Sequence, residues 1–137
     1  MINIPLALVA DYANVSREGK LNIMGIFDQI YSDSVPALHP QMQLIVTIVA
    51  DRSEADKEHS IIIELIDADN IAKLARVEGT VKFEKPPSGE EIRINHILQL
   101  NNIAFSKYGE YSFKIHINGV VKKSLPIKLV QTKTSRP

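Results

Sequence analysis

Tyr111-Ser112-Phe113-Lys114-Ile115-His116-Ile117, then Asn118-Gly119, then Val120 to Val130, is the stretch of the sequence that decides the fold. Apolar and polar residues alternate with period two on both sides of the Asn-Gly pair, which is typical of two antiparallel strands joined by a tight turn. The same alternation recurs along the whole chain between clusters of turn residues. The sequence therefore predicts an all-β protein, an antiparallel sandwich of two sheets with about eight strands.

The predicted strands are separated by segments rich in Gly, Pro, Asn and Asp. The connections 31–41 and 101–108 are long enough to cross between sheets, which favours a sandwich over an up-and-down barrel. In the longest strand, Gly79 predicts a bulge or a bend. One domain is expected over residues 1–130, followed by a frayed polar tail at 131–137. The predicted strands cover residues 4–13, 21–30, 42–50, 59–66, 71–83, 92–100, 110–117 and 121–130.

The last predicted hairpin contains a change of phase. Continuing the register of a two-residue turn at Asn118-Gly119 would point Lys122 inward, yet the apolar residues from Leu125 onward have the opposite parity. Either the loop has three residues, or a bulge lies near Lys122-Lys123. We favour the bulge, because a three-residue loop would turn Lys123 toward the core, where a charge is costly.

Composition excludes several classes of function. The chain has 137 residues, with sixteen basic and sixteen acidic side chains and no cysteine. Nucleic-acid binders usually carry a basic excess, so no nucleic-acid partner is expected. The absence of cysteine rules out disulfides and thiolate metal sites, and it suits a reducing compartment. The apolar run from Ile4 to Ala10 is too short to span a bilayer and lacks a positive n-region, so we expect a soluble, cytoplasmic protein with no membrane partner.

Two resemblances follow from particular residues. The run Tyr108-Gly109-Glu110-Tyr111-Ser112-Phe113, closing with Leu125-Pro126-Ile127, resembles the last two strands of immunoglobulin-like sandwiches. Tyr111 stands where such domains have a tyrosine corner, in which the hydroxyl bonds backbone a few residues upstream. The Cys…Trp…Cys signature of antibody domains is absent, so this resemblance implies the architecture alone.

A narrower resemblance covers nearly the whole chain. It is to an uncharacterised family of short, stand-alone bacterial proteins, and it implies no activity. The stretches that carry it are Asp11-Tyr12-Ala13, Gly19-Lys20-Leu21-Asn22-Ile23, Gly25-Ile26-Phe27-Asp28 and His39-Pro40-Gln41-Met42.

Antiparallel strands place successive loops at alternate ends of the sandwich. One end collects 14–20, 51–58, 84–91 and 118–120 and is densely charged, which is typical of a solvated cap. The opposite end combines the 31–41, 67–70 and 101–108 loops, whose aromatic and amide side chains are more typical of a binding surface. The alternative is that these aromatics close the end of the core. The candidate ligand-binding residues are Tyr31, His39, Asn102, Phe105 and Tyr108.

Motifs for metal binding or catalysis are weak. Only Asp33 is placed to join Asp67 and Asp69, whereas Ca²⁺ takes six to eight oxygen ligands, and a turn explains the aspartates equally well. The histidines lack metal-ligand spacing, and His96 follows the apolar parity of its strand, as expected for a hydrogen-bonded core or rim residue. There is no Gly-x-Ser-x-Gly elbow and no phosphate-binding glycine loop. We predict no metal, no cofactor and no enzymatic activity.

Two consecutive strands, 42–50 and 59–66, are apolar on both faces. A free sandwich face normally alternates apolar with polar residues, so the outward-facing residues of these strands need a second cover. Either the chain's own loops supply that cover, or another subunit does; the candidate interface residues are Ile45, Val49, Ile62 and Ile66. We predict a non-enzymatic protein-interaction or self-association module. The alternative is a small-ligand or carbohydrate-binding domain that uses the loop end described above.

Overall fold

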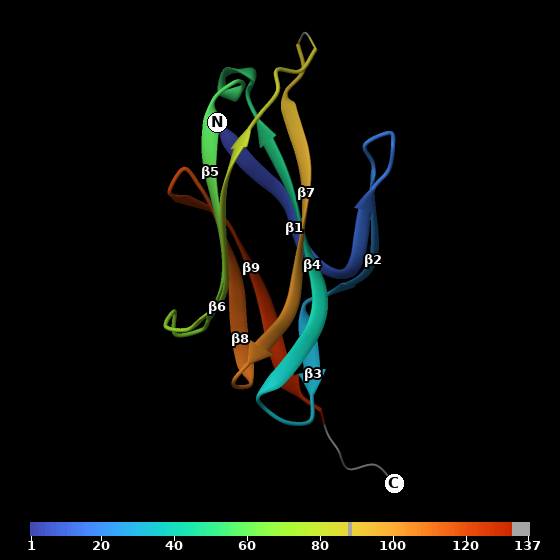
Figure 1. Cartoon of the computed structure of the whole chain (residues 1–137), viewed down its shortest axis with the longest axis vertical. Coiled ribbons are helices and arrows are strands. Elements are labelled where there is room, and N and C mark those ends of the chain that lie inside the picture. The colour runs from blue at the N-terminus through green and yellow to red at the C-terminus, as the bar shows by residue number, and fades with distance from the viewer. Residues whose placement is uncertain (88, 133–137) are drawn as a thin grey trace.

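A computed structural model describes residues 1–87 and 89–132 of the chain. These residues form nine β-strands and one short 3-10 turn, η1, at Arg52–Glu54 (Figure 1). The strands are β1 (Ile2–Val15), β2 (Leu21–Phe27), β3 (Gln29–Ser32), β4 (Ala37–Ala50), β5 (Glu58–Asp67), β6 (Lys73–Lys82), β7 (Ile92–Phe105), β8 (Gly109–Ile117) and β9 (Val120–Gln131). No helix in the described part of the chain is long and apolar enough to cross a membrane.

The strands form two sheets that pack face to face as an immunoglobulin-like sandwich (Figure 1). One sheet has the order β2-β1-β4-β7, and the other has the order β3-β9-β8-β5-β6. Neighbouring strands are antiparallel, except that β3 runs parallel to β9. The predicted all-β, two-sheet architecture is confirmed, with nine strands rather than about eight.

The additional strand arises where the predicted strand 21–30 changes sheets at Asp28. β2 ends at Phe27 beside β1, and β3 begins at Gln29 beside β9. The Asp28 carbonyl accepts a hydrogen bond from the Lys128 amide at 3.0 Å, so the backbone is paired again as soon as it leaves the first sheet. The alternation breaks at this crossing, because Asp28 and Gln29 are two consecutive polar residues between Phe27 and Ile30. The prediction of a single strand at 21–30 overlooked that break, and the structure has two strands there.

The predicted connections 31–41 and 101–108 are largely strand. β4 begins at Ala37 and pairs with β7 as far as Phe105. Pro40 is tolerated because β4 pairs with β1 only from Gln43 onward, and because the β4–β7 register omits Pro40 and Asn102. Asn102 has a φ of 55°, a left-handed conformation that asparagine adopts more readily than most residues.

Two predictions about irregular positions have different outcomes. Gly79 forms no bulge, because it pairs in register with Ile61; the shift in that ladder lies at Leu65/Ile66. The bulge predicted in the last hairpin is confirmed. Ile117 pairs with Val120 across the Asn-Gly turn, but the register then moves from His116↔Val121 to Ile115↔Lys123 and skips Lys122. The extra residue returns the apolar parity of β9 to the core.

The inward-facing residues of the two sheets form one core. Phe113, Ile115 and Ile117 of β8 are at most 1% exposed, and they face Leu44 and Val46 of β4, which are fully buried. The tyrosine corner is also confirmed. The Tyr111 hydroxyl donates to the Lys107 carbonyl at 2.7 Å and accepts from the Lys107 amide at 3.3 Å. These bonds fasten the turn before β8 to the core.

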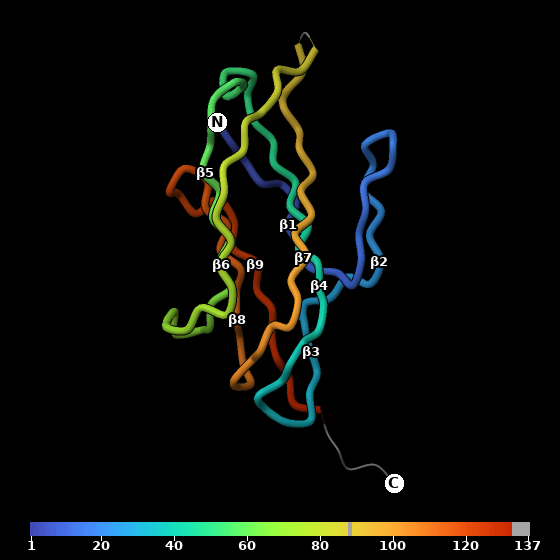
Figure 2. Tube along the Cα trace, viewed as in Figure 1, coloured from blue at the N-terminus to red at the C-terminus, as the bar shows by residue number. Residues whose placement is uncertain are grey.

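The β1–β2 hairpin forms a third layer outside the first sheet. Beyond Ala10 the two strands turn away from β4, and the hairpin stands beside the sandwich (Figure 2). Its Ala13, Leu21 and Ile23 pack on Ile45, which is fully buried. The hairpin turn also reaches β7, where the Asn95 amide donates to the Gly19 carbonyl at 3.4 Å. The chain itself therefore covers this outer face.

This arrangement corrects the predicted interface. β4 and β5 belong to different sheets, so the four candidate residues lie on opposite outer faces and cannot form one patch. Ile45 is buried under the hairpin and Ile66 is only 5% exposed, so the prediction that either contacts a partner is wrong. Val49 and Ile62 are partly buried.

The predicted tail at 131–137 begins too early. Gln131 belongs to β9, and the Thr132 amide donates to the Ser32 carbonyl. Residues 133–137 lie outside the described part.

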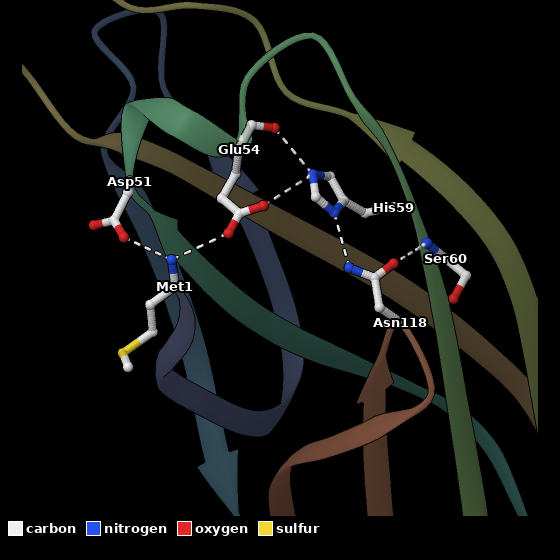
Figure 3. Close-up of polar contacts among 6 residues, drawn as sticks. All are labelled: Met1, Asp51, Glu54, His59, Ser60 and Asn118. Atoms are coloured by element: carbon white, nitrogen blue, oxygen red, sulfur yellow. Dashed lines mark hydrogen bonds and ion pairs between the residues drawn. The ribbon is translucent and has the colours of Figure 1, made fainter.

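A polar network closes the end of the sandwich where β5 begins (Figure 3). His59 is 3% exposed and lies between two partners. Its Nε2 is 2.9 Å from the Glu54 carbonyl, and its Nδ1 is 2.9 Å from the side-chain amide of Asn118. The Asn118 side-chain oxygen accepts from the Ser60 amide at 3.0 Å. The network thus ties η1 and the β8–β9 turn to the first residues of β5.

Candidate functional site

Two of the predicted ligand-binding rings instead close one end of the core. Phe105 is 1% exposed and meets Tyr111 edge-on, with ring centroids 4.9 Å apart and planes at 78°. Tyr108 is half-buried, and its hydroxyl donates to the Ser32 carbonyl at 3.1 Å. The alternative interpretation therefore holds for Phe105, and the prediction that it contacts a ligand is wrong because solvent does not reach it.

Tyr31 and His39 do come together, in an open groove of about 380 Å³ beside the end of β2. Tyr31 is 63% exposed, and its hydroxyl donates to the Gln29 side chain at 2.7 Å. Asn102 is exposed on β7 and does not line this groove. The remaining walls are Asp11, Gly25, Ile26, Phe27, Gln29 and Ile30.

The imidazole of His39 has an unused nitrogen in this groove. Its Nε2 is enclosed and has no hydrogen-bond partner among the described residues. The ring lies against Phe27, with centroids 5.7 Å apart. Burial lowers the pKa of His39, against the opposing effects of the Asp11 charge and a backbone hydrogen bond at Gln41. A neutral imidazole can donate or accept one further hydrogen bond. Solvent does not reach Nε2, so a ligand in the groove would bond to it only after a movement of the ring.

The groove exists because the β1–β2 pair bends sharply at Asp11 and Gly25. Gly25 has a φ of +74°, a conformation that glycine adopts without the steric cost of a side chain. The Asp11 carboxylate lies directly over it, since a Cβ built at Gly25 would be 2.5 Å from Asp11 Oδ2. Beyond this bend the hairpin turns across the outer face of β4 and β7.

β2 is an edge strand whose one irregularity is at Gly25, where the β1–β2 register skips Asp11 and Gly25. Its seven residues, Leu-Asn-Ile-Met-Gly-Ile-Phe, include neither a charge nor a proline. Natural sheets usually block free edges with charges, prolines, bulges or very short strands. The other edges follow this rule: β6 carries Lys73, Arg76, Glu78 and Lys82, β7 carries Arg93 and the irregularity at Asn102, and β3 has only four residues.

Exposed apolar side chains extend from this edge. Met24 is 66% exposed and Ile26 is 62% exposed, and Tyr12, which pairs directly with Met24, is 48% exposed. We call these three residues, together with the free edge of β2, the β2 surface. The sequence contains a signal for it, because Met24 and Ile26 share the face of the predicted strand 21–30 that also carries Asn22 and Asp28. Without the topology, that pattern does not identify an edge.

The outer face of the other sheet is polar, and its centre is Glu64. This carboxylate is 13% exposed and lies 2.7 Å from Lys73 Nζ, 3.5 Å from Arg76 Nε and 3.3 Å from His116 Nε2. The hydrogen bond from Lys73 holds the pKa of Glu64 below its ordinary value, and His116 adds to the effect. The cluster joins β5, β6 and β8 across the sheet.

The folded protein should therefore lose stability in acid as Glu64 becomes protonated. A carboxylate with a lowered pKa in the folded state stabilises the protein above its unfolded-state pKa, and that contribution is lost as the pH falls through the folded-state value. The midpoint temperature of thermal unfolding should fall as the pH is lowered from about 5 to about 3, and it should fall less in Glu64→Gln than in the wild type. Glu91→Gln is the control, because that side chain is 61% exposed. Equal acid shifts in wild type and Glu64→Gln would contradict this role.

The aspartates considered for calcium serve a turn. The Asp67 carboxylate accepts hydrogen bonds from the Ile71 amide at 2.9 Å and the Ala72 amide at 3.3 Å. Lys107 Nζ lies 3.2 Å from Asp69 and 3.7 Å from Asp67. In residues 1–87 and 89–132, no three His, Asp or Glu side chains are grouped so that they could hold a metal ion.

Comparison with known proteins gives a family and a fold. A family model described as "Family of unknown function (DUF6941)" matches residues 5–130. No curated protein matches the sequence. Among solved structures, the chain is similar to the alkylpurine DNA glycosylase AlkC of Pseudomonas fluorescens bound to DNA containing an abasic site analog, with a TM-score of 0.53 and 10% identity. The match covers 93% of this chain but only 30% of the glycosylase.

A second similar structure is an immunoglobulin-like protein from Pseudomonas aeruginosa, with a TM-score of 0.43 and 11% identity over 95% of this chain and 97% of that one. At such identities a structural likeness concerns the fold alone.

Proposed function

This chain belongs to the DUF6941 family of unknown function, and we propose that it is a non-enzymatic interaction module that associates with a second copy of itself through the β2 surface. The observation that carries the proposal is the uncharged free edge of β2. Unpaired N–H and C=O groups on such an edge accept another strand, and main-chain hydrogen bonds then join the two sheets.

The composition of β2 favours a second copy as the partner. Antiparallel pairing of β2 with itself centres on Met24, so that Leu21 of one copy lies opposite Phe27 of the other. Such a contact is two-fold symmetric and closes after two copies. It would also bury Met24 and Ile26, which are the most exposed apolar residues of the hairpin. The net charge is zero, so two copies do not repel each other.

Light scattering tests this proposal. At a protein concentration of about 50 µM, a dimer with a micromolar dissociation constant is largely assembled. The wild type should therefore have the mass of a dimer. The double variant Met24→Lys/Ile26→Lys should weaken dimerisation at least tenfold, because each lysine places a charge beside the pairing edge. Ile71→Lys is the matched control, since Ile71 is 80% exposed in the turn between β5 and β6 and should leave the mass unchanged.

A dimer that survives the double lysine substitution would overturn the proposed surface, provided that circular dichroism shows both variants folded. A wild type that stays monomeric would overturn self-association itself. In that case the groove of Tyr31 and His39 becomes the better candidate, as a small-ligand or carbohydrate-binding site. The enclosed, unpartnered Nε2 of His39 and the exposed ring of Tyr31 support that second function.

Two further parts of the proposal rest on the sequence. We propose that the module has no catalytic activity, because none of the nucleophile, phosphate-binding or metal-binding patterns is present in the sequence. We also propose a cytoplasmic location, since a chain without cysteine suits a reducing compartment.

A further inference from the structure

The sandwich has an apolar pocket on the side away from β2. There the edge strands β6 and β7 belong to different sheets and face each other without pairing (Figure 1). The pocket has a volume of about 230 Å³. Its apolar walls are Ile48, Ile61, Ile63, Val77, Val81 and Ile94.

The floor of this pocket is part of the core. Ile48 is 2% exposed and Ile63 is 4% exposed, so the pocket leads from the surface to the space between the sheets. Gly79 lines it from β6, and a Cβ built on this glycine would meet nothing within 4 Å. The missing side chain therefore keeps the space open, although its backbone conformation does not require glycine.

The rim of the pocket is polar. Thr80 and His96 line it together with Glu78, and the Glu78 carboxylate lies 2.7 Å from Arg76 Nη1. The hydroxyl and the imidazole both donate and accept hydrogen bonds. The Glu78 carboxylate disfavours an anionic end group, and its ion pair with Arg76 weakens its attraction for a cationic one, so the rim favours an uncharged end group.

We propose that this pocket binds a short aliphatic chain that ends in an uncharged hydrogen-bonding group. A cavity of about 150 Å³ in a protein core holds the six carbons of benzene, so the present volume fits roughly nine carbons by the same ratio. Walls formed by branched aliphatic side chains exclude water and give the chain its binding energy through burial of apolar surface. The hydroxyl end of a medium-chain alcohol then lies beside Thr80 and His96.

Methyl NMR with 1-octanol tests the proposal. In wild type labelled at Ile, Leu and Val methyls, the alcohol should cause saturable shifts confined to the methyls of the six apolar wall residues, Ile48, Ile61, Ile63, Val77, Val81 and Ile94. Gly79→Leu fills the pocket and should reduce those shifts at least fivefold. Ser124→Leu adds the same side chain at an exposed position of β9 and should leave them unchanged.

A second variant keeps the test decisive if Gly79→Leu fails to fold. Ile94→Ala enlarges the pocket. It should raise the affinity for 1-decanol, relative to the affinity for 1-octanol, at least threefold. Shifts that rise linearly across the whole surface, or that persist in folded Gly79→Leu, would overturn the site. Saturation by toluene but not by 1-octanol would overturn the aliphatic class. Because β2 is the opposite edge of the first sheet, the octanol response should be the same in Met24→Lys/Ile26→Lys, so this result and the dimer result are independent.

Discussion

Replacing His59 by alanine should lower the free energy of unfolding by about 3 kcal/mol, and the midpoint of thermal unfolding by roughly 10 °C. The ring is buried and stacks on Phe83, with centroids 4.8 Å apart. The Glu54 carbonyl can only accept a hydrogen bond, so Nε2 carries the proton. Nδ1 then accepts from the amide of Asn118, whose orientation is fixed by its bond to Ser60 (Figure 3). Alanine leaves a cavity and removes a hydrogen-bond partner from the Glu54 carbonyl and from the Asn118 amide, at contacts that are partly buried.

Urea denaturation monitored by circular dichroism measures this effect. His59→Gln should recover about half of the loss, because its amide can still donate to the Glu54 carbonyl. His96→Ala is the control; His96 is exposed, and its removal should change stability by less than about 0.5 kcal/mol. If the free energy of unfolding of His59→Ala were within about 1 kcal/mol of the wild-type value, the loss would be on the scale of a surface substitution. That result would mean that the network contributes little to folding.

Replacing Gly25 by alanine should cost about 2 kcal/mol, from two separate sources. An L-residue at a φ of +74° is disfavoured by roughly 1 kcal/mol. In addition, the new Cβ would be 2.5 Å from Asp11 Oδ2 and 3.0 Å from Asp11 Cγ, so the carboxylate must move away. The bend between the sandwich and the β1–β2 hairpin therefore depends on this glycine.

Gly19→Ala separates the two sources. Gly19 has a similar φ of +86°, but a Cβ there would meet nothing within 4 Å, so this variant measures the backbone cost alone. Asp11→Ala in the Gly25→Ala background should restore the part of the loss that comes from the carboxylate. Chemical denaturation of the four proteins gives these differences. Equal losses in Gly19→Ala and Gly25→Ala would show that Asp11 imposes no constraint.

Local chemistry made several parts of the fold predictable. The phase change in the last hairpin follows from the cost of a buried lysine, and the structure places the extra residue at Lys122. The position of Tyr111, four residues after Lys107, is likewise a local pattern with a local hydrogen bond. The inward parity of β8 follows from alternation alone.

The positions of layers were not predictable in the same way. Alternation shows that Ile45 faces outward, but it does not show that the hairpin from the start of the chain lies over it. The strands 42–50 and 59–66 are consecutive, yet their pairing partners are distant in sequence and assign them to different sheets. The free edge of β2 was unpredictable for the same reason. The sequence shows that Leu21–Phe27 lacks charge, but only the strand order makes that segment an edge.

The crossing at Asp28 also determines how the sandwich opens in thermal motion. On that side the main chain passes directly from one sheet to the other, so the separation between the sheets is held by covalent bonds. Midway along β6 and β7 only side chains bridge the sheets. If the two layers move apart, we expect the seam between the middles of β6 and β7 to widen more than the side at Asp28. A small apolar molecule bound as we propose would then enter at the edge opposite the proposed contact between two copies.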